Sequence, residues 1–229
     1  MTDLKIPIIL PEYLYYSNTF TNFVLDLKSY HIKNIIVAVD HVLEAESPEL
    51  HFSKIRKLKS EFKEFAKENS VRFKFCTNLL MENIIYSPLD ISAIAPKKSN
   101  LFFITLPLGT NAEVAMKNIF TIKNLGYIPV IMNFDSVAVF YPQSFCKALL
   151  TTENIYFCFN SNSLYDPKID SYIRTALSLN NTVLFLCSHF TSSLFYKNVE
   201  RYIRILPKKH KLNFVNSTSQ SIKKIFRLK

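Results

Sequence analysis

The sequence predicts an α/β fold, a distorted seven-stranded (β/α) barrel of parallel strands. Short β-branched and aromatic runs alternate with helical patterns along the 229 residues, which is typical of repeated βα units. The apolar runs are nearly continuous, as in strands that are buried on both faces. No internal repeat or Pro/Ser-rich linker divides the chain. An open doubly wound sheet is the alternative that the same pattern allows.

Seven apolar runs are the predicted strands. Each is rich in Val, Ile, Leu, Phe or Tyr, the residue types that fit a buried sheet. The predicted strands are residues 5–10, 34–39, 71–76, 101–106, 128–132, 155–159 and 182–187.

The clearest predicted helix follows the second strand. The motif Ser-Pro-Glu at 47–49 supplies an N-cap, a proline at the first helical position and an early acid. Phe52, Ile55, Phe62 and Phe65 then recur at helical spacing. This pattern predicts one amphipathic helix that begins after Ser47.

Further helices have their own boundary signals. Asn111 can cap a helix that stops at Gly126, and Asp166 followed by proline can open another. We also expect a helix after Phe190 and a last one near 217–226. Residues 1–206 are therefore the predicted barrel, and residues 207–229 are a basic, helical C-terminal segment.

The net charge of +10 indicates an anionic partner, and the basic residues gather toward the C-terminus. From Lys197 onward Glu200 is the only acid. A solvated basic surface is the alternative interpretation. The candidate anion-binding residues are Lys208, Lys209, Lys223, Lys224 and Arg227.

Several classes of site are excluded or disfavoured. With two glycines in the chain, neither a G-x-G-x-x-G loop nor a P-loop can form. The four cysteines include no Cys-x-x-Cys pair, so we expect buried reduced thiols rather than disulfides or a zinc cluster. No apolar run reaches the roughly 18 residues of a membrane span, and the first residues lack a signal-peptide pattern. The sequence therefore predicts a cytoplasmic protein.

In either architecture, functional side chains lie at the carboxyl ends of the strands. A catalytic metal needs three or more converging His, Asp or Glu side chains, and the strand ends offer four such residues on three strands. The alternative is structural, with Asp40 and Asp135 capping the following helices. His31, His51 and His210 lie in helix or loop contexts without a signal. The strand-end candidates are Asp40, His41, Thr77, Asn78, Asn133, Asp135, Asn160, Ser188 and His189.

One stretch carries a family resemblance. The segment "LFFITLPLGTNAEVAMKNIFTIKNLGYIPVIMNFD", residues 101–135, resembles capsule-type protein-tyrosine phosphatases of the polymerase and histidinol phosphatase (PHP) superfamily. The resemblance implies a PHP-like, distorted seven-stranded barrel. It also implies a metal-dependent phosphoesterase that acts on phosphotyrosine of kinases controlling bacterial polysaccharide export.

The residues that match the family's metal ligands depart from its pattern. The histidine after the family's "PVIA" falls on Asn133 and the nearby glutamate on Asp135. The opening His-x-His pair falls on Ile6 and Ile8, and a ligand glutamate falls on Leu79. Neither isoleucine nor leucine can bind a cation, and loss of even one support can weaken metal affinity about tenfold or more.

Two further motifs are partly retained. The segment "IIVAVDH" resembles the family's "IIATPHH", which places Asp40 and His41 on two histidines. The final Asp-x-His motif falls near "LFLCSHF" in one of two registers. Those registers give Ser188 with Phe190, or Cys187 with His189.

The resemblance with these losses implies a pseudoenzyme, without catalytic residues or a metal cofactor. Its implied role is a binding or regulatory protein in bacterial polysaccharide synthesis or export. The partners would be an acidic or phosphotyrosine-bearing protein, the inner face of the membrane, and further copies of the chain.

Two alternatives stay open. The first is a divergent phosphoesterase or transferase that has rebuilt a divalent metal site, with Mn or Zn, from Asp40, His41, Asp135 and His189. The second is a peripheral membrane or nucleic-acid binding protein that uses the basic tail.

Overall fold

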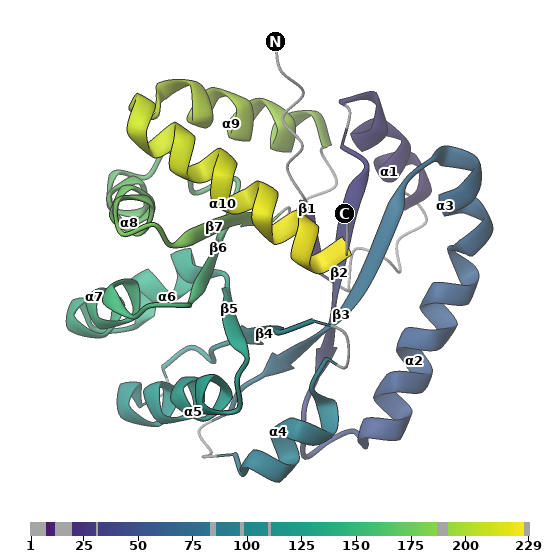
Figure 1. The fold of residues 1–229 in the computed structure, drawn as a ribbon, viewed down its shortest axis with the longest axis horizontal. Coiled ribbons are helices and arrows are strands. Elements are labelled where there is room, and N and C mark those ends of the chain that lie inside the picture. Colours follow the sequence, from purple (N-terminus) through teal and green to yellow (C-terminus); the bar gives the residue numbers. More distant parts are fainter. Residues whose placement is uncertain are drawn as a thin grey trace.

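The computed structural model describes residues 8–11, 20–30, 32–82, 86–96, 99–109, 111–186 and 192–226. Seven parallel strands form one closed barrel in chain order, and the first strand pairs with the last (Figure 1). The predicted barrel is therefore confirmed, and the open doubly wound sheet is excluded.

All seven predicted strands are present. Residues 5–7 and Cys187, which the prediction also placed in strands, lie outside the described residues. The second and third strands run further toward their carboxyl ends than their apolar runs indicated. The strands are β1 (Ile8–Pro11), β2 (Asn34–His41), β3 (Arg72–Leu80), β4 (Leu101–Thr105), β5 (Ile128–Met132), β6 (Tyr156–Asn160) and β7 (Thr182–Leu186).

Helices surround the barrel in Figure 1. The predicted caps are confirmed: Ser47 accepts from the Leu50 amide, and Asn111 and Asp166 accept from amides in the first turns of their helices. The helices are α1 (Phe20–Ser29), α2 (Pro48–Glu61), α3 (Lys63–Asn69), α4 (Pro88–Ile94), α5 (Ala112–Asn124), α6 (Phe134–Phe140), α7 (Gln143–Thr151), α8 (Pro167–Ser178), α9 (Ser192–Ile205) and α10 (Lys208–Phe226).

Alternation along the strands separates two cores. One cluster combines strand residues such as Val37 and Ile104 with helix residues such as Ile55, so it lies between the barrel and the helices. The other contains strand residues, with Ile36 and Phe103 among them, and fills the interior of the barrel. Alternate residues along each strand therefore face the barrel interior, and the residues between them face the helices.

The basic C-terminal segment forms α10, which packs on the barrel wall. Phe214 is buried, and its ring lies 5.3 Å from that of Phe185 in β7. The Asn213 side-chain amide donates to the Leu177 carbonyl in α8 at 2.9 Å. Within the described residues, no helix has the length and apolar character needed to cross a membrane.

Candidate functional site

Three strands end in a hydrogen-bonded polar layer at the carboxyl mouth of the barrel. Asp40 and Asn78 are direct partners in the β2–β3 ladder, and both have the parity of interior residues. The Asn78 side-chain Nδ2 donates to Asp40 Oδ1 at 2.8 Å and to Thr105 Oγ1 at 3.0 Å. Asn78 is buried, so its amide is a fixed part of the mouth.

A second carboxylate, Asp135, joins two other elements. Its Oδ1 accepts from the Asn160 backbone N–H at 3.1 Å, and its Oδ2 accepts from Ser163 Oγ at 2.9 Å. Asn133 precedes it at φ 50°, in the left-handed region, at the N-cap of α6 and without a side-chain cap bond. Asp135 therefore ties the start of α6 to the loop after β6.

The helix-capping roles expected for the two aspartates are wrong. Asn133 occupies the N-cap of α6, and Ser47 occupies that of α2, the helix after β2. Asp40 instead accepts across the strands, because its side chain points along the sheet normal toward the interior.

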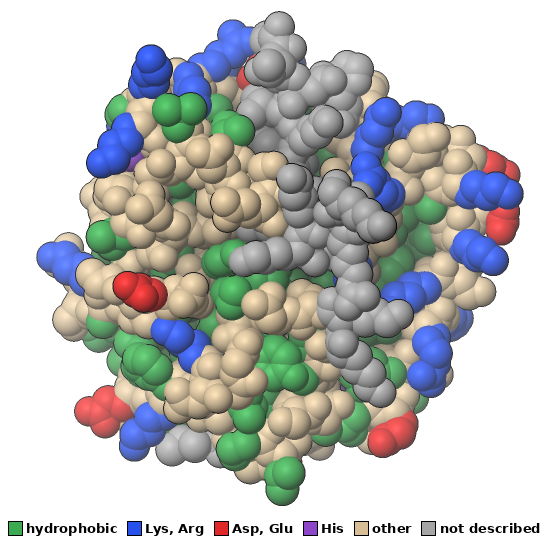
Figure 2. Space-filling view, viewed as in Figure 1, with side chains coloured by type: hydrophobic (Ala, Val, Ile, Leu, Met, Phe, Trp, Pro, Cys, Tyr) green, Lys and Arg blue, Asp and Glu red, His purple; other side chains and the backbone are tan. Residues whose placement is uncertain are grey.

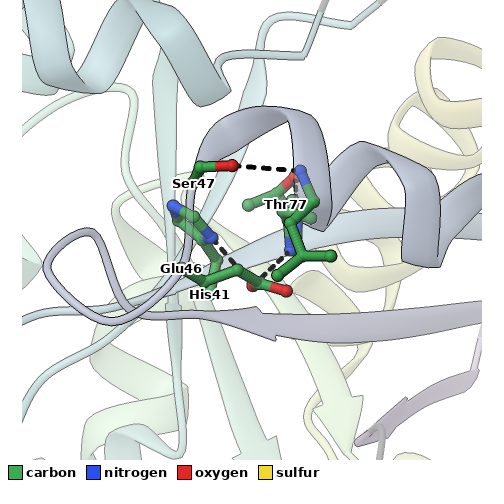
Figure 3. Close-up of polar contacts among 6 residues, drawn as sticks. His41, Glu46, Ser47 and Thr77 are labelled. Carbon is green, nitrogen blue, oxygen red and sulfur yellow. Dashed lines mark hydrogen bonds and ion pairs between the residues drawn. The ribbon is translucent and has the colours of Figure 1, made fainter.

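His41 lies on the opposite face of β2 and belongs to another cluster. Its Nδ1 is 3.1 Å from Glu46 Oε2, and His51 Nδ1 is 3.3 Å from the same oxygen (Figure 3). His51 Nε2 lies 2.9 Å from Thr77 Oγ1 in β3. Glu46 thus fastens the first turn of α2 to the end of β2.

Sequence reasoning set His51 aside and did not consider Glu46. Glu46 and His51 flank the Ser-Pro-Glu helix start, but no local signal in the sequence shows that this turn packs against the end of β2. His51 in that turn then meets His41, with ring centroids 4.5 Å apart.

Burial controls the charge of this cluster. It lowers the pKa of His51 to about 4, with the neighbouring His41 as the next cause, while Glu46 partly opposes the shift. His51 is therefore neutral at pH 7. Because a carboxylate only accepts hydrogen bonds, each Nδ1 that faces Glu46 carries the ring proton. His41 Nε2 is buried and has no hydrogen-bond partner among the described residues.

The described residues of the mouth do not fit a catalytic metal. Asp40 and Asp135 are both engaged in hydrogen bonds. Neither aspartate forms a metal-ligand cluster with a described histidine. Ile8 and Leu79 are buried in the outer apolar core. A catalytic metal needs three or more convergent donors, and the described residues of the mouth do not supply them.

The outer cluster has donor types that zinc uses, with ligand atoms of His41, Glu46 and His51 within 4.8 Å of one another. In the structure both imidazole N–H groups are directed at one carboxylate oxygen. The contacts of these side chains also link β2, β3 and α2.

The other predicted residues are distributed elsewhere. Ser188 and His189 lie outside the described residues, as does Arg227. Lys208 and Lys209 are exposed at the start of α10, whereas the backbone alone is described for Lys223 and Lys224. The structure shows hydrogen bonds within two predicted pairs, Asp40 with Asn78 and Asp135 with Asn160.

No family model and no curated protein matches the chain. A solved structure does match, from work on YwqE of Bacillus subtilis and CpsB of Streptococcus pneumoniae, described as metal-dependent tyrosine phosphatases. The TM-score is 0.64 at 12% sequence identity, over 92% of this chain and 87% of that chain. The resemblance predicted from residues 101–135 is thus confirmed at the level of fold.

Proposed function

We propose, from the fold shared with metal-dependent tyrosine phosphatases, that this chain is a PHP-type barrel that binds or regulates rather than hydrolyses. One observation carries the proposal: the Asn78 side-chain amide donates a hydrogen bond to the Asp40 carboxylate at the mouth. A catalytic metal at that place would require several ligand atoms that are free to bind it. An amide N–H cannot coordinate a cation, and its hydrogen bond competes for the carboxylate oxygen.

The proposed setting is bacterial polysaccharide synthesis or export, at the cytoplasmic side of the membrane. Support comes from the fold and from the family resemblance of residues 101–135. The proposed partner is an acidic or phosphotyrosine-bearing protein. Lys208 and Lys209, exposed on α10, suit such a partner because ammonium groups pair with phosphate oxygens.

The test of inactivity is a phosphatase assay. The purified chain is incubated with p-nitrophenyl phosphate and with a phosphotyrosine peptide, with added Mn²⁺, Zn²⁺ or Mg²⁺ in turn. We expect no hydrolysis above that of buffer. Turnover that Asp40→Ala and Asp135→Ala each remove, in variants that stay folded, would show a working active site instead.

Partner binding has a separate test. Phosphorylated and unphosphorylated copies of an acidic, tyrosine-rich peptide are titrated into the chain. We expect tighter binding of the phosphorylated copy, and weaker binding of both after Lys208→Gln with Lys209→Gln. Equal affinity of the two copies would contradict this partner.

A further inference from the structure

A cavity of about 330 Å³ lies in the barrel wall between α2 and the start of β4, and Asp40, Asn78 and Asp135 are not among its lining residues. Its size falls in the range of small-molecule sites. Side chains from both faces of β3 line it, together with one face of α2. The lining residues are Phe52, Ile55, Arg56, Lys59, Lys74, Phe75, Cys76, Thr77, Pro96, Ser99 and Leu101.

The cavity exists because β3 and β4 pair over part of their length. β3 pairs with β2 from Arg72 through Leu79, whereas its described pairing with β4 begins at Asn78. The first half of β3 therefore diverges from β4. Side chains of α2 and the segment before β4 border the opening, so the fold itself creates the space.

Three cationic side chains from two elements border this space. Arg56 and Lys59 lie one turn apart on α2, on the face that also carries Phe52, and Lys74 comes from β3. None of the described residues that line the cavity is an aspartate or glutamate. Figure 2 shows Lys and Arg side chains gathered along the side of the molecule where α2 and α3 lie.

The thiol of Cys76 lies within the electrostatic influence of two of these cationic side chains. Burial raises its pKa to about 11, while Lys74 and Lys59 act in the opposite direction. Both ammonium groups are thus close enough to favour a negative charge at this position. The protonated thiol itself is a poor nucleophile, so the cavity is suited to binding an anion rather than to thiol chemistry.

The remaining walls are apolar. Phe52 and Phe75 are aromatic, and Ile55 and Leu101 are buried aliphatic side chains. An apolar group entering the cavity would lose contact with water against these walls, which is favourable. A fully hydrated inorganic anion would gain no such contribution.

We propose that this cavity binds a small organic phosphate, with the phosphate between Arg56, Lys59 and Lys74 and the apolar group against Phe52 and Phe75. A phosphate dianion matches three cations better than a monocarboxylate does, and the guanidinium of Arg56 can bind two of its oxygens. The site goes beyond the proposed function, because it is separate from the mouth and does not depend on whether the mouth is catalytic.

The test is isothermal titration with benzylphosphonate, whose C–P bond a phosphatase does not hydrolyse, so binding is measured independently of turnover. Inorganic phosphate and benzyl alcohol are titrated in parallel. We expect benzylphosphonate to bind at least tenfold more tightly than either. Equal binding of inorganic phosphate, or no binding of benzylphosphonate at a concentration of about 1 mM, would overturn the proposal.

Three variants locate the binding. Arg56→Gln and Lys74→Gln should each weaken benzylphosphonate binding about tenfold, the loss of one charge-assisted contact. Lys57→Gln is the matched control, since Lys57 lies on the same helix but faces Glu61 at 3.9 Å. Arg56 is exposed, so its variant should keep the wild-type unfolding temperature. An unchanged affinity in Arg56→Gln, or an equal loss in Lys57→Gln, would place the ligand elsewhere.

Discussion

Asn78 decides the chemistry of the barrel mouth at the scale of single residues. Its buried amide donates both to Asp40 and to Thr105, so three strands are joined by hydrogen bonds. The buried amide of Asn78 offsets part of the cost of placing the Asp40 carboxylate at the mouth, because a buried polar group needs hydrogen-bond partners. Among the described residues of the mouth, these contacts engage both Asp40 and Asn78 in hydrogen bonds.

Asn78→Asp would place two carboxylates face to face at hydrogen-bond distance. We expect a loss of about 1–3 kcal/mol in the free energy of unfolding at pH 8, because like charges repel and the amide donor is gone. The loss should shrink at pH 5, where the pair can share one proton. Urea unfolding at both pH values measures it, with the exposed Asn162→Asp as the control. An equal loss at both pH values would contradict the charge pair.

His51 makes stability depend on pH. Its pKa is about 4 in the folded chain and about 6.5 when exposed, so between these values the unfolded chain takes up a proton that the native chain does not. Stability from this group is full above pH 6.5 and falls as the pH drops toward 4, by up to about 3 kcal/mol.

The check is the difference in unfolding free energy between pH 7 and pH 4.5. His51→Gln should reduce that difference, whereas Ser53→Ala, a change at an exposed residue of the same helix, should leave it unchanged. The same pH dependence in wild type and His51→Gln would show that another group is responsible.

Asp135 acts at the scale of elements, where it joins α6 to the loop after β6. Asp135→Ala removes the acceptors of the Asn160 N–H and the Ser163 hydroxyl. We expect a loss of about 1–3 kcal/mol in unfolding free energy. Urea denaturation measures it, and the exposed Glu153→Ala serves as the control. A loss no larger than that of the control would mean that water replaces both contacts.

The elements differ in how well local sequence predicts them. Ser47 and the following proline predicted the start of α2, because both signals are local. The break at Phe62, which separates α2 from α3, was missed, since the apolar spacing continues across it. The start of α6 was misplaced. Asp135 was the expected cap, whereas the N-cap is Asn133, in the left-handed region, and the helix begins at Phe134.

The sequence predicted where the polar residues of the site lie better than it predicted which of them contact one another. Strand-end polarity identified Asp40 and Asn78, because the carboxyl ends of parallel strands meet at one mouth. Strand-end polarity did not distinguish His41 from these interior residues. The alternation of side chains directs His41 to the other face of β2. The cluster with Glu46 and His51 depends on how α2 returns to the barrel, which is a tertiary contact.

At the scale of the whole molecule, barrel closure gives every strand two neighbours and brings all seven carboxyl ends together. This geometry is shared with metal-dependent tyrosine phosphatases at 12% identity. The packing of apolar strands and helices can therefore persist while polar residues at the mouth change, since fold and site rest on different side chains.

We propose that hydrogen bonds take the place of metal ions at the barrel mouth. Elemental analysis of the purified chain, after growth with added Mn²⁺ and Zn²⁺ and dialysis, tests this proposal directly. We expect well below one metal ion per chain. A full equivalent of metal that Asp40→Ala removes and Glu46→Gln retains would contradict it.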